Sequence, residues 1–268
     1  MAVVQSTISN DVQGRFLAEI AQSHEDMRAA QALRYAVFVE ELGADGPLVD
    51  DENRLERDRY DDFADQLILK DVSRAETDQV VGVYRLMDAE GARAAGGFYT
   101  EQEYDLKPLL GSGRRVLELG RSCLHPDYRG GIAMVPLWQA LGREIEARGA
   151  EVLFGVASFH GTDLEALAAP LSLLHRDHLA PAALRVRSRA ASEFQVIDTF
   201  DRVEALRQIP ALIKAYLRLG GFVGEGAFVD TAFNTTDVCL ILDTAAMNPR
   251  QRAIYAGTGG QARTGAAR

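Results

Sequence analysis

A strand, a glycine turn, a helix and a second strand follow one another in the middle of the chain. The run Val116-Leu-Glu-Leu-Gly-Arg-Ser-Cys-Leu124 leads into a turn with the adjacent glycines Gly130 and Gly131. Residues 132–148 have helical spacing, and residues 151–158 are a buried strand-like run. Two strands joined by one helix are parallel neighbours, which requires a layered fold of sheet and helices. The turn aims unpaired backbone amides and a helix dipole at one point, which suits a phosphate, although many such turns only reverse the chain.

The remaining patterns predict further strands and helices around this unit. Ser23 and Asp26 resemble a capping box that opens the first helix. We see no internal repeat, so we expect one domain over 1–250 with an elaboration from about residue 165, followed by a flexible tail over 251–268. The other predicted elements are strands over 15–21, 66–71, 80–87 and 236–242, and helices over 23–42, 164–174 and 209–219.

The charge distribution points away from nucleic acid. The formal net charge is −10, which argues against a general nucleic-acid role. Eleven Asp or Glu residues and three Arg residues lie between Glu40 and Asp65, so most of the excess negative charge is local. This stretch is either a solvated loop or a surface that attracts a cationic substrate.

We expect a cytoplasmic protein from the sequence. No run approaches the roughly 18 apolar residues of a membrane span, and the N-terminus lacks a basic-then-apolar secretory pattern. Cys123 and Cys239 are far apart and outside any metal-ligand spacing, so we expect reduced core thiols and no metal site.

Four motifs follow one another in the first half of the chain. They are Arg34-Tyr-Ala-Val-Phe38, Glu56-Arg-Asp-Arg-Tyr-Asp61, Val81-Gly-Val-Tyr-Arg-Leu86 and Glu118-Leu-Gly-Arg121. In this order they resemble the motifs of the acyl-homoserine lactone synthases, within the GNAT acyltransferase fold. The resemblance implies an α+β protein whose central, mixed and mostly antiparallel sheet is flanked by helices, with the strand-turn-helix unit holding a pantetheine-linked acyl donor.

Further segments in the second half of the chain narrow the resemblance. They are Phe154 to Gly161, Leu171 to His175, Leu184 to Val186, Pro210 to Gly220 and Asp230 to Val238. These segments resemble the L-ornithine N-alpha-acyltransferases, and the resemblance covers roughly residues 15 to 245. It implies transfer of a 3-hydroxy fatty acyl group from acyl carrier protein to the alpha amine of L-ornithine, giving lyso-ornithine lipid.

The phosphate turn departs from the GNAT pattern of Gln or Arg, two residues, Gly, one residue, then Gly or Ala. Gly131 and Ala133 fit the last two places, but the first place falls on Tyr128, and Arg129 comes one position late. A coenzyme A pyrophosphate needs a full ring of amide donors, whereas a carrier-protein arm has one phosphate. We therefore expect Arg129, Gly130, Gly131 and Ala133 to bind the 4'-phosphopantetheine of an acyl carrier protein as co-substrate, with no permanently bound cofactor.

Glu118 is the candidate general base. It lies in mid-strand among apolar residues, and its neighbours on the chain point to the opposite face. Amide formation from a thioester needs a route for the proton of the amine, which Glu118 supplies directly or through water. Arg121 and Arg85 are expected to anchor the substrate carboxylate. The alternative for all three is a structural ion-pair network.

The acidic loop and the first helix supply candidate substrate contacts. Asp58 and Asp61 could hold the side-chain ammonium of ornithine while the alpha amine reacts; the alternative is helix capping and solvent contact. Arg34 and Phe38 are one turn apart and could face the donor pocket together, although Phe38 could equally belong to the core.

Docking of an acidic acyl carrier protein requires a local basic surface, because this chain is acidic too. We assign it to Arg185, Arg187 and Arg189, together with Arg129 and Arg114-Arg115, against the alternative of scattered solvated arginines. The helix over 209–219 is a candidate for peripheral contact with the inner membrane, where a single-chain lipid product must go, although its spacing also suits a core helix.

Three other functions compete with the main hypothesis. The same chemistry could act on lysine, glutamine or glycine, and the first-half motifs are compatible with an acyl-homoserine lactone synthase, although the long C-terminal elaboration argues against it. The non-enzyme alternative is a hemolysin-like, membrane-active protein, but no amphipathic stretch is long or basic enough to favour it.

Overall fold

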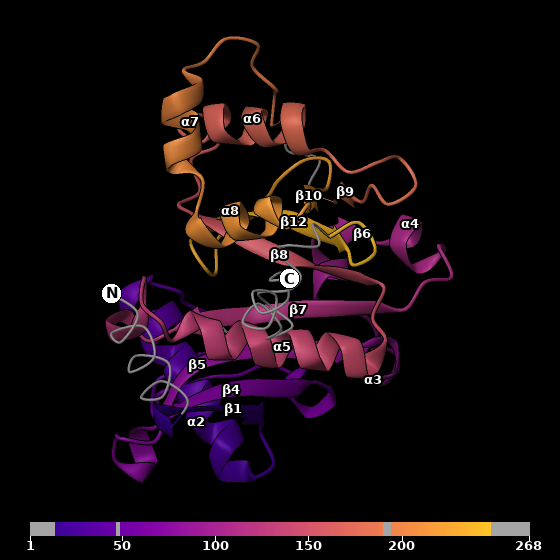
Figure 1. Ribbon diagram of the computed structural model, residues 1–268. Coiled ribbons are helices and arrows are strands. Elements are labelled where there is room, and N and C mark those ends of the chain that lie inside the picture. Colours follow the sequence, from indigo (N-terminus) through magenta and orange to yellow (C-terminus); the bar gives the residue numbers. More distant parts are fainter. Residues whose placement is uncertain (1–13, 47–48, 190–193, 248–268) are drawn as a thin grey trace, which may run out of the picture. The chain divides into compact units, whose positions relative to one another are not determined.

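The computed structural model describes residues 14–46, 49–189 and 194–247, and Figure 1 labels most of their strands and helices. The fold is α+β, as predicted. Eight strands belong to a mixed, mostly antiparallel central sheet, in which only the pairing of β7 with β8 is parallel among the described pairings. No helix of the described residues has the length and the apolar character needed to cross a membrane. The tail predicted over 251–268 lies outside the described residues.

The chain divides into two compact units, and strand β7 (Val116–Leu124) contributes to both. Among the described residues, the first unit comprises 14–86 and 121–148, and the second comprises 87–120 and 149–247. The single domain expected over 1–250 stays a prediction.

Three antiparallel strands form the sheet of the first unit. β1 (Phe16–Ile20) pairs with β4 (Asp65–Asp71), and β4 pairs with β5 (Val80–Asp88), so the predicted first strand and the predicted hairpin are both confirmed. Two helices, α2 (His24–Arg34) and α5 (Met134–Arg148), pack against these strands.

The two helices cover opposite faces because successive strand residues point in opposite directions. Ile68 packs with Ala30 and Leu33 of α2. Its neighbour Leu69 points the other way, toward Gly82 and Leu137 of α5. A Cβ at Gly82 would lie 3.2 Å from Leu137 Cδ2, so a glycine there permits the close approach of α5 to the sheet.

The start of the first helix follows the predicted capping box. The Ser23 hydroxyl accepts a hydrogen bond from the Asp26 N–H at 3.0 Å. Beyond Arg34 the helix continues as a π-helical segment, Tyr35–Glu41. The helical stretch therefore ends near Leu42, as predicted.

Strand β7 and strand β8 (Val152–His160) confirm the predicted parallel unit. In the second unit β8 also pairs antiparallel with β12 (Thr235–Asp243) along its whole length. The short strands β10 (Phe222–Val223) and β11 (Phe228–Asp230) both pair antiparallel with β12.

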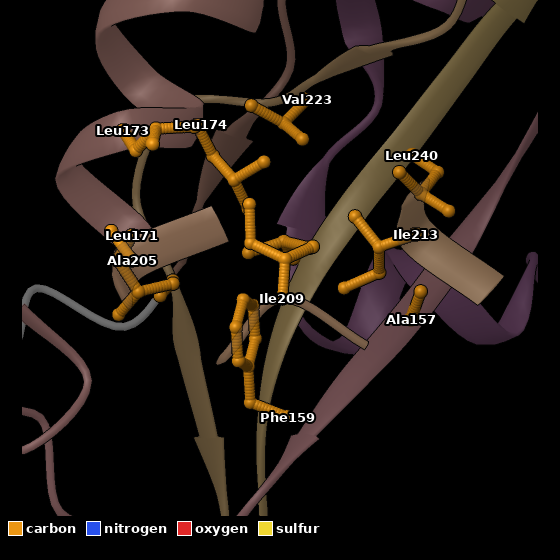
Figure 2. Packing of buried hydrophobic residues seen from close by; sticks show 12 residues of the cluster. Ala157, Phe159, Leu171, Leu173, Leu174, Ala205, Ile209, Ile213, Val223 and Leu240 are labelled. Atoms are coloured by element: carbon orange, nitrogen blue, oxygen red, sulfur yellow. The ribbon is translucent and has the colours of Figure 1, made fainter. Parts of the chain in front are cut away.

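Three helices of the C-terminal elaboration form one hydrophobic core with this sheet (Figure 2). They are α6 (Ala168–His178), α7 (Arg202–Gln208) and α8 (Ala211–Arg218). In Figure 2, Leu174 of α6 and Ile213 of α8 lie in the same cluster as Leu240 of β12. Burial of each such side chain contributes about 1.5–3 kcal/mol, so this core stabilises the elaboration against the sheet.

The helix predictions in this part were only partly right. The helix expected over 164–174 begins at Ala168, because Asp163 accepts the amides of Glu165 and Ala166 in a preceding turn. The helix expected over 209–219 begins after Pro210, since the residue before a proline disfavours helix. Helix α7 was missed.

Short elements complete the described fold. They are α3 (Ala89–Ala95), α4 (Lys107–Leu110), the strand pairs β2 (Val49–Asp50) with β3 (Leu55–Glu56) and β6 (Tyr104–Asp105) with β9 (Arg187–Ser188), and 3-10 turns at Asp61–Phe63, Glu76–Asp78, Tyr99–Gln102 and Pro126–Tyr128.

Candidate active site

A buried ion network in the first unit joins the motif residues. Arg34, at the end of α2, donates from Nε to Glu56 Oε2 at 2.5 Å and from Nη1 to Asp61 Oδ1 at 2.8 Å. Arg121 of β7 donates from Nε to the other Glu56 oxygen at 3.1 Å. The side chains of Arg34 and Glu56 are fully buried, and that of Asp61 is 4% exposed. Glu56 therefore links the first helix to the strand that carries Glu118.

Asp58 joins Arg85 to Arg121 in the same network. Arg85 Nη1 donates to Asp58 Oδ1 at 2.6 Å and to Asp61 Oδ1 at 3.0 Å, and Arg121 Nη2 donates to Asp58 Oδ2 at 2.9 Å. Burial alone would raise the pKa of Asp58, but the charges of Arg85 and Arg121 outweigh it and lower the pKa to about 2. The three arginines and three carboxylates of the network balance in charge.

The sequence left two roles open for Arg85 and Arg121, which were to anchor the substrate carboxylate or to form a structural ion-pair network. The contacts described above form such a network. Asp58 and Asp61 each accept hydrogen bonds from two arginines. An oxygen that holds the ornithine ammonium must be accessible to the substrate. The expected ammonium contact of Asp58 and Asp61 stays a prediction. Arg121 has a positive φ of 49°, a conformation that costs a non-glycine residue energy and is retained where the surroundings fix it. Phe38 packs, partly buried, against the core cluster of α2.

Glu118 is buried, 3% exposed, and its carboxylate accepts two backbone amides. Tyr99 N–H donates to Oε2 at 3.1 Å, and Thr100 N–H donates to Oε1 at 2.7 Å. Two fixed amides hold the carboxylate in one orientation, so the structure gives it the rigidity that a base needs, and its catalytic role stays a prediction.

The parallel ladder between β7 and β8 is short. It comprises three residue pairs and ends at Glu118 and Phe154, although β8 continues to His160. At the next residue of β8, a Cβ on Gly155 would lie 2.1 Å from the Leu119 carbonyl oxygen. The regular parallel ladder thus ends directly after Glu118, where the backbones of Leu119 and Gly155 approach each other closely.

The glycine turn presents open amides to a surface hollow. The N–H groups of residues 130–133 donate to no other described residue. Gly131, Ile132 and Ala133 line the hollow together with Arg15, Phe16, Asp127 and Tyr128. Open amides at the N-terminus of α5, with the helix dipole behind them, are suited to an anion.

Arg129 and Tyr128 have partners of their own. The guanidinium of Arg129 forms two hydrogen bonds to the Glu41 carboxylate, at 2.5 and 2.6 Å. The Tyr128 hydroxyl donates to Asp71 Oδ2 at 2.6 Å. The expected phosphate contact of Arg129 stays a prediction, and the turn's backbone amides are the better placed donors.

Three of the arginines predicted for carrier-protein docking are half-buried or exposed. Arg185 donates to the Ala180 carbonyl at 2.8 Å, Arg189 donates to the Tyr104 carbonyl at 3.3 Å, and Arg187 pairs with Glu225 at 3.0 Å. Their assignment to a docking surface stays a prediction.

Sequence reasoning missed one acidic cluster altogether. Glu103, Asp230 and Asp237 each offer an oxygen within 4.8 Å of the others, and no other group of this kind occurs among the residues that the structure describes. Glu103 and Asp237 are 2–3% exposed. No motif signals the cluster, because its members are distant in sequence. Glu56 was quoted within a motif, but its place between two arginines was also missed.

Comparisons with known proteins identify the family. A model of the acetyltransferase (GNAT) domain matches residues 33–139. An L-ornithine N(alpha)-acyltransferase of Rhodobacter capsulatus is 56% identical over 240 residues, which cover 88% of this chain and 93% of that protein. The chain belongs to this family. The resemblance indicated by the motifs is confirmed, and the protein is an acyltransferase.

Solved structures of low identity share the fold. An N-acyl amino acid synthase from uncultured soil microbes, FeeM, has a TM-score of 0.52 at 11% identity, covering 91% of this chain and 97% of that one. A CoA-dependent acyl-homoserine lactone synthase, BjaI, has a TM-score of 0.50 at 14% identity, covering 92% and 89%. The GNAT fold is confirmed, and this acyl-homoserine lactone synthase shares the fold.

Proposed function

We propose that this acyltransferase moves a 3-hydroxy fatty acyl group from acyl carrier protein to the alpha amine of L-ornithine, giving lyso-ornithine lipid. The observation that carries the proposal is the set of open amides at 130–133 beside a hollow at the start of α5. These donors suit the single phosphate of a 4'-phosphopantetheine arm. The acceptor follows from the relative that is 56% identical and named an L-ornithine N(alpha)-acyltransferase.

In the proposed reaction, the neutral alpha amine attacks the thioester carbonyl carbon. The new C–N bond forms as the carbonyl oxygen becomes an oxyanion, and backbone amides of β7 beyond the end of the ladder stabilise it. Glu118, held by the Tyr99 and Thr100 amides, takes the proton of the amine directly or through one water. The C–S bond then breaks, and the sulfur of the carrier arm leaves as a thiol after it takes up a proton.

The buried network has a supporting role in this proposal. Arg34 and Arg85 fix Glu56, Asp58 and Asp61, and Glu56 and Asp58 in turn hold Arg121. A guanidinium fixed in this way orients an anionic group of the substrate without a loss of side-chain entropy on binding.

The partners follow from the same chemistry. We propose that acyl carrier protein docks on the surface of Arg185, Arg187 and Arg189, and that the enzyme works in the cytoplasm with peripheral contact at the inner membrane, where its product goes. Neither a resident cofactor nor nucleic acid enters the proposed reaction.

The test is product analysis with purified components. The full chain is mixed with 3-hydroxyacyl carrier protein and, in turn, ornithine, lysine, glutamine and glycine, and the products are identified by mass spectrometry. The proposal expects an ornithine amide and at least tenfold less product from the other acceptors. A preference for another amino acid, a lactone product, or transfer only from a coenzyme A thioester would contradict it.

A further inference from the structure

We infer that Glu103, Asp230, Asp237 and Thr235 form the binding site for the side-chain ammonium of the acceptor amino acid. The inference rests on the proposed function, because it assigns the part of the enzyme that distinguishes a diamino acid from a neutral one. All four residues lie in the second unit.

The acidic members come together from three elements of that unit. Asp230 ends β11, Asp237 lies in β12, and Glu103 precedes β6. The Tyr104 hydroxyl donates to the backbone carbonyl of Asp237 at 3.0 Å, which fixes the segment of Glu103 against β12. Their three carboxylate oxygens lie within 4.8 Å of one another.

Thr235 adds an independent observation at the same place. Its hydroxyl oxygen is buried, the residue is 7% exposed, and the oxygen has no hydrogen-bond partner among the described residues. Thr235 is the cross-strand partner of Asp230 and lies two residues from Asp237 on β12, so all three side chains occupy one face of the sheet. A buried hydroxyl without a partner, beside clustered carboxylates, indicates a ligand that is both cationic and a hydrogen-bond donor.

The dimensions of the cluster fit an ammonium group. Oxygens placed about 2.8 Å from one ammonium nitrogen in tetrahedral directions lie about 4.6 Å from one another, close to the observed limit of 4.8 Å. An ammonium has three N–H donors, and the three clustered carboxylates can accept them. A magnesium or calcium ion needs about six or more oxygens, which this buried site supplies less readily.

The cluster also lies on the face that carries Glu118. Glu118 is opposite Phe154, and Asp237 is opposite Ser158, an even number of residues further along β8. Ser158 is exposed, so the cluster borders an accessible part of this face. A substrate can therefore reach the cluster from the same side of the sheet as the base.

The reach of ornithine matches this spacing. A donor carbonyl seated about two residues beyond the end of the ladder, level with Val156, is about 7 Å from the level of Ser158 at a strand rise of roughly 3.3 Å per residue. Five bonds of about 1.5 Å separate the two nitrogens of ornithine, or about 6 Å in extended form. The alpha amine can thus meet the carbonyl while the ammonium contacts the cluster.

The test compares two acceptors that differ only in the charge. L-norvaline has the carbon chain of ornithine without the amine, and the readout is the ratio of kcat/KM for ornithine to kcat/KM for norvaline, which cancels a general loss of activity. We expect Asp237→Asn to lower this ratio by about 30-fold or more. Thr235→Val, a milder change that serves if the first variant does not fold, should lower it about fivefold.

Asp243→Asn is the matched control, because Asp243 lies on the same strand but pairs with Arg114, and its ratio should equal that of the wild type. A ratio unchanged within about twofold in both cluster variants, or a fall in Asp61→Asn instead, overturns the inference. The inference is also overturned if the wild type binds one equivalent of divalent metal, measured by mass spectrometry, and Asp237→Asn does not. Transfer to neither amino acid by the wild type refutes the proposed function itself, whereas transfer with unchanged ratios refutes only the ammonium site.

Discussion

Replacing Arg34 by leucine tests whether the buried network stabilises the first unit. Arg34 forms two ion pairs, at 2.5 and 2.8 Å, with carboxylates whose side chains are 0–4% exposed. Each hydrogen bond to a buried charged group contributes about 1.5–3 kcal/mol, and uncovering one partner of a buried pair costs about 3–5 kcal/mol. Since Arg121 still contacts Glu56 in the variant, we expect the free energy of unfolding to fall by about 3–4 kcal/mol.

The assay is urea unfolding followed by tryptophan fluorescence. Trp138 is the single tryptophan of the chain and lies on α5 in the same unit as Arg34, so its signal reports that unit. The expected result is a lower midpoint with an unchanged slope.

Arg148→Leu is the control for the loss of an arginine. Its partner Asp65 has a side chain that is 48% exposed, so solvent screens the pair and the loss should stay below about 1 kcal/mol. A loss below about 1 kcal/mol for Arg34→Leu as well would refute the reasoning, because the buried charges would then not depend on their partner.

Three further predictions concern the base, the pH dependence of stability and the close approach of β7 and β8. Glu118→Gln should leave thermal unfolding within a few degrees of the wild type and abolish acyl transfer, measured by mass spectrometry; retained transfer would remove the base assignment. The pKa of Asp58 is about 2, below its usual 3.8, so the contribution of Asp58 to stability is present above pH 3.8 and is lost as pH falls toward 2. The urea midpoint of the wild type should therefore fall over this range. An equally steep dependence of the midpoint on pH in Asp58→Asn would contradict this prediction. Gly155→Ala brings a Cβ against Leu119 and should destabilise by about 2 kcal/mol or more in denaturant unfolding, whereas Gly131→Ala, with its nearest atom at 3.7 Å, should match the wild type.

The elements of the sheet could be predicted because each is marked by local patterns. The run from Val116 to Leu124 is a strand over its full predicted length, since apolar residues on both faces favour a buried strand. The Ser23 capping bond was predictable because it depends on residues three apart. Boundaries in the C-terminal elaboration were less predictable, because turns such as that of Asp163 compete locally with helix.

The residues of the buried ion network lie in the motifs, but their pairing could not be predicted from the sequence. The motifs included Arg34, Asp58, Asp61, Arg85 and Arg121, yet a sequence does not tell which carboxylate meets which arginine across elements far apart in the chain. The acidic cluster of Glu103, Asp230 and Asp237 shows the same limit, because only the pairing of β11 with β12 and the anchoring of β6 bring it together.

The central claim, amide formation at the alpha amine of ornithine from a carrier-bound acyl group, is tested most directly by isotope labelling. Purified enzyme is given 3-hydroxyacyl carrier protein and ornithine labelled with nitrogen-15 only at the alpha position, and fragmentation of the product locates the label. We predict that the labelled nitrogen is the amide nitrogen in all of the product. Label in a free amine, or no amide at all, would contradict the account.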